Sequence, residues 1–313
     1  MPGIKELKTR IKSIGSTRKI TRAMQMVSAA KMRKAQIAAL SSRTYSNLAW
    51  ALIHSITTNI ESLNPLLKSY PQATKTGVII ISSNKGLVGG FNANLMHTAR
   101  PLLDNDQIIA ELLVMGRKAK DYAVRFNKNL KADFPKSDVW VGIDSIYPLA
   151  KMVSDFYQTG QYKSISIVYN QFISTLIQKA TIKHLLPFAE EAKGTLDPYE
   201  ASYEPHIEEA DTDSVLFDLK MNGGDTLNSS FLFEPSPDFV LNHLLPRIIE
   251  SQIYQALLES DASEHSARMV MMKNATEAAG DIIDDLTLTY NGMRQSKITT
   301  ELSEITAGRI ALE

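Results

Sequence analysis

Residues 244–293 read LLPRIIESQIYQALLESDASEHSARMVMMKNATEAAGDIIDDLTLTYNGM, and this stretch decides the fold. Apolar side chains return there every three or four positions, which is the spacing of one face of an α-helix. No proline occurs between Pro246 and the last residue, Glu313. If the helix runs unbroken from Arg247 to Glu313, a rise of ~1.5 Å per residue makes a rod on the order of 100 Å long. Such a rod needs a partner along its length.

The N-terminal region offers that partner. It contains no proline between Pro2 and Pro65, and its apolar seam is interrupted only at Gly15 and Ser16. The seam consists of Ile4, Leu7, Ile11 and Ile14, and it resumes at Ile20, Met24 and Val27. Two long amphipathic helices at opposite ends of one chain pack most simply as an antiparallel coiled coil.

The residues between these helices alternate between strand and helix patterns. We expect strands at 77–82, 112–115, 138–143, 164–169 and 181–186, and helices at 92–103, 117–126 and 147–157. This alternation indicates a largely parallel sheet covered by helices. The predicted fold class is therefore α/β: a long antiparallel coiled coil of the N- and C-terminal helices with an inserted Rossmann-like α/β domain.

We predict four segments along the chain. Residues 1–65 form the N-terminal coiled-coil helix, 74–188 the central α/β domain, 189–237 an acidic loop or extension, and 238–313 the C-terminal coiled-coil helix. The charge is zero overall but unevenly placed. Up to Arg43 the only acidic residue is Glu6, against eleven lysines and arginines, whereas 190–218 holds ten acidic residues. A basic rod favours an acidic partner.

Composition excludes several classes of protein. The 313 residues include no cysteine, which excludes disulfide scaffolds, thiolate nucleophiles and cysteine-bound zinc. No run of about 18 apolar residues occurs, so we expect no membrane span. The basic N-terminus lacks aromatic residues before Tyr45, so we expect no nucleic-acid partner. An arginine-rich N-terminus also fits a transit peptide, but this apolar seam continues beyond such a leader and needs burial.

A glycine-rich turn, KGLVGGFN at 85–92, follows the first expected strand and precedes a helix. Amides at a helix N-terminus hold phosphate well, so nucleotide binding is one interpretation. The spacing matches neither a Rossmann fingerprint nor a Walker A loop, which favours a structural turn that lets helix and strand pack closely. The six histidines lack paired ligand spacing, and no catalytic motif occurs. We expect no catalytic, cofactor or metal site.

The last residues, 290–313, carry few large side chains, and the first helix is too short to accompany them. A lone helix with a small, mixed surface is unstable by itself. We therefore expect other chains to enclose this end.

Three stretches resemble the gamma subunit of F-type ATP synthases, of bacterial type. They are ITRAMQMVSAAKMRKA at 20–35, ARMVMMKNAT at 267–276 and YNGMRQSKITTELSEI at 290–305, and the glycine-rich turn adds a fourth. The resemblance implies a central rotor shaft that threads a ring of alternating alpha and beta subunits and has no active site of its own. Ion flow, of protons or sodium, turns the membrane c ring and the shaft with it. The turning shaft brings each beta site in succession through states of different nucleotide affinity.

The resemblance also implies partners and contact residues. The partners are the alpha and beta subunits, the epsilon subunit and the c ring; the membrane is met only peripherally, through the complex, at the cytoplasmic face of the bacterial inner membrane. Contacts to beta are expected from Arg268, Arg294, Gln295, Thr299 and Glu301. Met24 lies opposite that region, where the helices pack and torque passes. A foot segment with Phe231 and Glu234 faces the c ring and epsilon. For Met24 and Glu301, ordinary helix packing is the alternative interpretation.

Two departures from the family pattern stand out. The usual Asp-Arg before the glycine turn is Asn84-Lys85 here, and the usual cysteine is Val88. The acidic stretch 190–218 looks longer than is common, which suggests a solvated extension that touches epsilon or a stator element. The alternative to a rotor subunit is an independent α/β nucleotide-binding protein or enzyme that dimerises through its terminal helices. The absence of a cleavable leader suggests a bacterial source.

Overall fold

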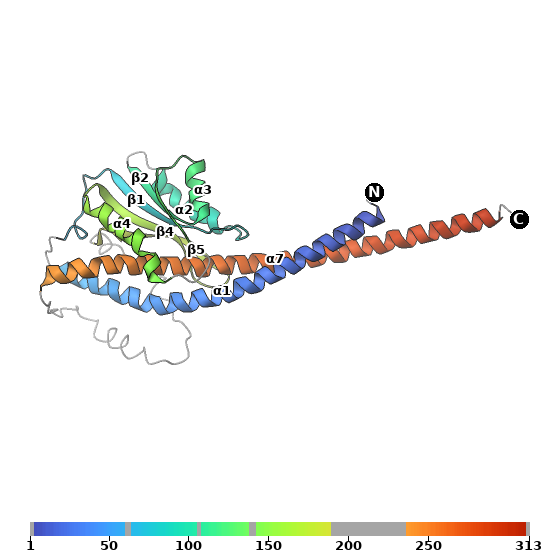
Figure 1. Ribbon diagram of the computed structural model, residues 1–313, viewed down its shortest axis with the longest axis horizontal. Coiled ribbons are helices and arrows are strands. Elements are labelled where there is room, and N and C mark those ends of the chain that lie inside the picture. The colour runs from blue at the N-terminus through green and yellow to red at the C-terminus, as the bar shows by residue number, and fades with distance from the viewer. Residues whose placement is uncertain (1–2, 60–63, 105–107, 138–141, 189–235, 311–313) are drawn as a thin grey trace, which may run out of the picture.

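Two helices form a shaft in the computed structural model, which describes residues 3–59, 64–104, 108–137, 142–188 and 236–310. Helix α1 (Ile4–Asn59) and helix α7 (Pro237–Ile310) lie side by side, and a compact α/β domain sits against α7 (Figure 1). The helices are antiparallel, because the hydroxyls of Thr21 and Thr276 lie 2.8 Å apart while Gln255 Nε2 donates to the carbonyl of Ala39 at 3.2 Å. The predicted fold class is confirmed.

Helix α1 continues through the interruption of its apolar seam. A side chain at Gly15 would meet no other atom within 4 Å, so this glycine marks an open position on the helix rather than a bend. The hydroxyl of Ser16 donates to the carbonyl of Lys12 at 3.1 Å. Both residues therefore fit a continuous helix, although neither extends the seam.

Helix α7 begins at Pro237 and runs through Pro246. Proline lacks the N–H that continues a helix, so packing must hold this part of α7 together. Its side chains supply the packing, because Leu245, Ile249 and Ile253 are almost completely buried in the main core, which they share with the sheet. The stretch after Pro246 is thus part of a longer helix, whose start at Pro237 lies one residue before the expected bound at 238.

The sheet has five strands in the order β3-β2-β1-β4-β5. The strands are β1 (Lys75–Ile81), β2 (Ile109–Met115), β3 (Leu130–Phe134), β4 (Tyr162–Phe172) and β5 (Gln178–Leu186). Four are parallel, and β5 pairs antiparallel with β4. The chain places β2 and β3 on one side of β1 and then crosses over to place β4 and β5 on the other side. The strand order therefore reverses at the boundary between β1 and β4.

Helices cover both faces of this sheet. They are α2 (Phe91–Leu103), α3 (Arg117–Arg125) and α4 (Tyr147–Gln158), with a 3-10 turn η1 (Ile143–Ser145) before α4. One face packs on α2 and α3 through Val78 and Ile80. The other packs on α4 and on the first half of α7 through Ile79 and Ile81. Since β1 is buried on both faces, its sequence reads as an unbroken apolar run.

One expected strand, at 138–143, is wrong. The third strand is Leu130–Phe134, and Ile143 begins the 3-10 turn; residues 138–141 lie outside the described residues. Strand β3 pairs only with β2, and its residues alternate between half-buried and exposed. The alternation in LKADF covers only five residues, of which two are charged, so this edge strand is a weak signal.

Candidate functional site: the rod end and the junction cluster

The end of α7 extends beyond α1 and is a single helix there (Figure 1). Large apolar side chains are exposed on it: Ile298, Leu302 and Ile305. Their spacing of four and three residues places them on one face of the helix. The term "rod end" is used below for residues 294–307, all of which are exposed. An exposed apolar face on an isolated helix marks a surface for a partner.

Four hydroxyl groups on the rod end donate to backbone carbonyls of the same helix. Thr299 donates to the carbonyl of Gln295 at 3.0 Å, and Ser303 donates to that of Thr299 at 2.9 Å. Thr300 and Thr306 make the same bond to the carbonyl four residues earlier. These four hydroxyls therefore need few new hydrogen bonds when the rod end is enclosed.

Four of the predicted contact residues lie on the rod end. Arg294 and Glu301 are seven residues apart and so share the apolar face with Ile298 and Ile305. Gln295 and Thr299 lie one above the other beside that face. Glu301 also forms an ion pair with Lys297 at 3.5 Å, in which both side chains are more than half exposed. An exposed pair of this kind contributes little to stability.

The other predicted residues lie elsewhere. Arg268 is buried and pairs within its own helix, donating to Glu264 at 2.8 Å. Met24 is half-buried one turn after Thr21, so antiparallel pairing places it between the levels of Arg268 and Thr276 rather than opposite the rod end. Phe231 and Glu234 lie outside the described residues, as does the acidic stretch 190–218.

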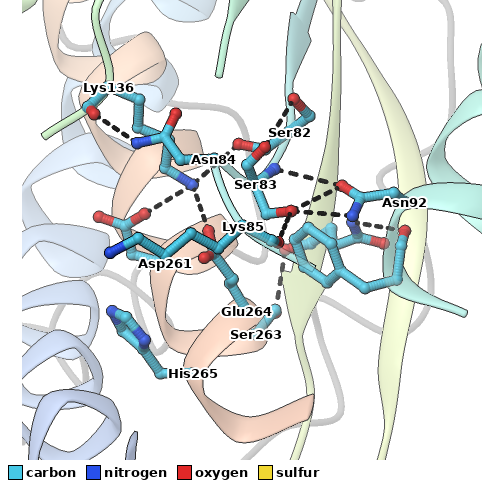
Figure 2. Close-up of polar contacts among 12 residues, drawn as sticks. Ser82, Ser83, Asn84, Lys85, Asn92, Lys136, Asp261, Ser263, Glu264 and His265 are labelled. Carbon is cyan, nitrogen blue, oxygen red and sulfur yellow. Dashed lines mark hydrogen bonds and ion pairs between the residues drawn. The ribbon is translucent and has the colours of Figure 1, made fainter. Parts of the chain in front are cut away.

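A polar cluster that the sequence did not reveal joins the α/β domain to α7 (Figure 2). The junction cluster consists of Ser82, Lys136, Asp261, Glu264 and Arg268. Lys136 follows β3, and its side chain is only 4% exposed. Its ammonium group lies 2.9 Å from an Asp261 carboxylate oxygen and 2.8 Å from one of Glu264, and it donates to the Ser82 carbonyl at 3.1 Å.

Opposite charges set the protonation of this cluster. Burial lowers the pKa of Lys136, but the carboxylates of Asp261 and Glu264 raise it further, so the net pKa is raised and the ammonium stays charged. Burial raises the pKa of Glu264, but Lys136 and Arg268 lower it below the usual range. The junction cluster thus contains two cations, Lys136 and Arg268, and two anions, Asp261 and Glu264. It is largely buried, and these four charges sum to zero.

The glycine-rich turn lies next to the junction cluster, and residues just before the turn bond to helix α3. The amide of Ala119 donates to the Ser82 hydroxyl at 2.8 Å, and the amide of Arg117 donates to the Asn84 side chain at 3.2 Å. These amides open helix α3, where a phosphate group would otherwise bind. The serine and asparagine oxygens therefore occupy two of the amide donors at the start of α3.

Helix α7 also covers the crevice where open α/β sheets bind ligands, beside the strand-order reversal between β1 and β4. The Ser263 hydroxyl donates to the carbonyl of Asn170 in β4 at 3.0 Å. A cavity of about 150 Å³ remains between the glycine turn, β4 and α7, lined by Phe91, Asn170 and Met271 among others. A ligand pocket has roughly 300–1,000 Å³, so this cavity is too small for a nucleotide.

Comparisons with known proteins identify the family. Residues 3–312 match the family model described as ATP synthase. The chain is 38% identical to the ATP synthase gamma chain of Pelotomaculum thermopropionicum and 37% identical to that of Histophilus somni, over the full length of both proteins in each case. This chain belongs to the ATP synthase gamma chain family. The resemblance to this family, predicted from the four sequence stretches, is thereby confirmed. The gamma chain is a subunit of the ATP synthase complex.

Solved structures share the fold. A chain of the Euglena gracilis mitochondrial ATP synthase, in a structure of OSCP, F1 and c-ring, superposes with a TM-score of 0.64 at 19% identity, covering 99% of this chain and 94% of that one. A chain of the Tetrahymena thermophila central stalk and c-ring gives 0.57 at 23% identity, covering 82% and 99%. At these identities the likeness establishes the shared fold.

Two further findings bear on the site. Among the described helices, none is long and apolar enough to cross a membrane. Across the described parts of the chain, no cluster of three or more histidine, aspartate or glutamate residues is arranged to hold a metal ion.

Proposed function

We propose that this chain is the central rotor shaft of an F-type ATP synthase. The rod end carries the proposal. It is the part of α7 that extends beyond α1 as a single helix, and its apolar face is exposed. Such a surface is stable only inside a sheath of other chains. Membership of the gamma chain family supplies the identity of the sheath, a ring of alternating alpha and beta subunits.

The mechanism follows from asymmetry. A shaft of two unequal helices presents a different side to each beta subunit, so each beta site meets different contacts at a given angle. A shaft can shift a site between conformations only through contacts that differ between those conformations. Rotation driven by proton or sodium flow through the c ring then changes the nucleotide affinity of the beta sites one after another.

Individual residues have proposed roles in this mechanism. Arg294, Gln295, Thr299 and Glu301 contact beta loops at the rod end, and Met24 packs where torque passes. Arg268 is also proposed as a beta contact, with its buried pair to Glu264 holding the side chain in place. In the foot, Phe231 and Glu234 face the c ring and the epsilon subunit.

The division into a shaft (1–65 and 238–313), a central domain (74–188) and an acidic and foot segment (189–237) is part of the same proposal. The chain contains no active site of its own, requires no cofactor, and meets the membrane only peripherally, at the cytoplasmic face of a bacterial inner membrane. The occupied amides at the start of α3 and the small cavity beside α7 support this view over an independent nucleotide-binding enzyme.

Reconstitution tests the proposal. The purified chain is mixed with alpha and beta subunits, and ATP hydrolysis and nucleotide binding are measured with and without it. We expect the chain alone neither to bind nor to hydrolyse ATP, and to stimulate hydrolysis by the alpha and beta subunits. Tight stoichiometric binding of ATP to the isolated chain, or no stimulation by a folded chain, would contradict the proposal.

A further inference from the structure

The contact between α7 and the α/β domain has two halves of different chemistry. In the first half, Leu245, Ile249 and Ile253 pack into the core of the sheet. Apolar burial of this kind is strong but has no preferred direction. It keeps the domain on the shaft, but other interactions must set its exact orientation around the shaft.

The second half is polar and directional. Besides the junction cluster, the hydroxyls of Ser263 and Ser266 donate to the carbonyls of Asn170 and Thr175, at 3.0 and 2.6 Å. Hydrogen bonds weaken steeply when their angle changes, so they fix orientation in a way that apolar contacts do not. The glycine-rich turn lies at this polar half, where a side chain at Gly89 would come within 3.1 Å of the Met271 sulfur.

Lys136 is the residue through which the cluster reaches the turn. Its ammonium group joins the carboxylates of α7 to the Ser82 carbonyl, which stands at the end of β1 where the turn begins. Its own carbonyl accepts from the Asn84 side chain at 2.6 Å. Lys136 thus contacts both α7 and the two ends of the short segment Ser82–Asn84 (Figure 2).

We propose that Lys136 is a positioning residue for the shaft: by bridging Asp261 and Glu264 of α7 to Ser82, it fixes the glycine-rich turn at one angle about α7. The proposal rests on the rotor function, because the angle of the turn matters to neighbouring subunits only if the domain turns with the shaft. Without the bridge, the domain stays attached through its apolar half, while the turn shifts relative to α7.

Disulfide formation measures the position of the turn directly, since the chain contains no cysteine of its own. Val88 of the turn and Ala267 of α7 pack in one small apolar cluster. The reporter pair is therefore Val88→Cys with Ala267→Cys in the full chain. The control pair is Thr21→Cys with Thr276→Cys, which reports on the pairing of α1 with α7 and includes no residue of the turn.

Two variants separate positioning from charge balance. Lys136→Met removes the ammonium group from the carboxylates of Asp261 and Glu264, while Arg268 still pairs with Glu264. Lys136→Met with Asp261→Asn removes one charge of each sign, so the cluster returns to zero net charge but the bridge is still missing. We expect the single variant to lower Tm by several degrees and the double variant to recover most of that loss.

Disulfide formation in the reporter pair should slow about tenfold in both variants, because a freed turn has a lower effective concentration at α7. The control pair should form at an unchanged rate. Three results would overturn the proposal: an unchanged reporter rate, a reporter rate that recovers together with Tm in the double variant, or equal slowing of the control pair.

A functional arm uses the complex with alpha and beta subunits. The double variant should lower stimulated ATP hydrolysis at least about threefold, because a displaced contact surface costs rate even when it stays bound. Oxidising the reporter pair re-fixes the turn and should restore the rate; no restoration overturns the inference. If the chain with Lys136 intact does not stimulate hydrolysis, that result contradicts the proposed rotor function and not the role of Lys136. The disulfide rates in the free chain still test the position of the turn in that case.

Discussion

At the scale of single residues, buried charge is the feature with the largest energetic consequence. Lys136, Glu264 and Arg268 are nearly inaccessible, yet all three stay charged because each has an opposite charge within about 3 Å, the closest being 2.8 Å. His265 adjoins this cluster without a carboxylate of its own. Burial, the largest cause, and the nearby cations Arg268, Lys136 and Lys31 together lower the pKa of His265 to about 4, although the Glu264 carboxylate opposes the shift.

His265 should therefore make the chain sensitive to acid. Its pKa is near 6.5 when unfolded and about 4 when folded, so the unfolded state binds more protons between these values and stability falls as pH falls through this window. Urea unfolding from neutral pH to pH 4 should show a loss of up to about 3 kcal/mol in the native chain that His265→Gln does not suffer. Equal losses in both would contradict the assignment.

Gly116 should tolerate no side chain. Its φ is +103°, and an added Cβ would lie 2.3 Å from the Ser82 carbonyl oxygen. Gly116→Ala should lower the free energy of unfolding by at least about 2 kcal/mol. Gly15→Ala is the matched control, since its surroundings are open, and it should raise the free energy of unfolding by up to about 1 kcal/mol. Denaturant unfolding of both variants checks the contrast, and a Gly116→Ala chain as stable as the parent would refute it.

The sequence did not predict the junction cluster, for a physical reason. Lys136 meets residues of α7 more than a hundred positions later, and its own surroundings, FPKSD, resemble an ordinary surface loop. An isolated lysine after a proline carries no period that a pattern search detects. Only the fold brings Lys136 to α7, whereas Arg294, Gln295, Thr299 and Glu301 were placed by family motifs that need no tertiary information.

At the scale of elements, the exposed apolar face of the rod end is the part of α7 that we expect to contact other chains. Ile298 and Ile305 are 48% and 69% exposed. Replacing both with serine should change Tm of the isolated chain by at most about 2 °C, because no buried contact is lost. The same variant should weaken stimulation of ATP hydrolysis by the alpha and beta subunits at least about tenfold, since two buried anchors disappear.

Thr300→Ala is the control for this face, because Thr300 points to the other side of the helix. Its hydroxyl already donates to the Ser296 carbonyl at 3.0 Å. Stimulation should be close to that of the parent chain. If the Ile298 and Ile305 variant stimulates as well as Thr300→Ala does, the apolar face is not a contact surface.

The pairing register of α1 and α7 is a second element-scale prediction. Thr21→Cys with Thr276→Cys should form a disulfide readily under mild oxidation, because the two hydroxyls lie 2.8 Å apart. Thr17→Cys with Thr276→Cys, one turn out of register, should form it at least about tenfold more slowly. Gel mobility under non-reducing conditions distinguishes them, and comparable rates would contradict the antiparallel register.

Elements with a strong period were predictable, and elements defined by their neighbours were not. The run that becomes β1 shows its burial in the sequence itself. The seam of α1 was predicted only in part, because Leu7 is buried whereas Ile20 and Val27, which were expected to continue the seam, are exposed. Strand β3 is exposed on one edge and contains Lys131 and Asp133, so its pattern resembles a loop. The continuation of α7 through Pro246 could not be predicted from the sequence either. It depends on the packing of α7 against the sheet in the main core.

At the scale of the whole molecule, a slender two-helix shaft carries an α/β domain to one side and ends in a single helix (Figure 1). This shape is asymmetric about its long axis, so rotation presents a changing surface to whatever surrounds it. The unequal lengths of the two terminal helices were apparent from the sequence. The orientation of the domain on the shaft was not apparent from the sequence, because it depends on the junction cluster.

Rotation itself is the most direct test of the central claim. A cysteine introduced at the partly exposed Lys118 of α3 carries a bead, and the chain is assembled with alpha and beta subunits fixed to a surface. Upon addition of ATP, the bead should turn continuously in one direction, and it should stop when ATP is exhausted. Sustained ATP hydrolysis by the same complexes with a bead that does not rotate would contradict the account.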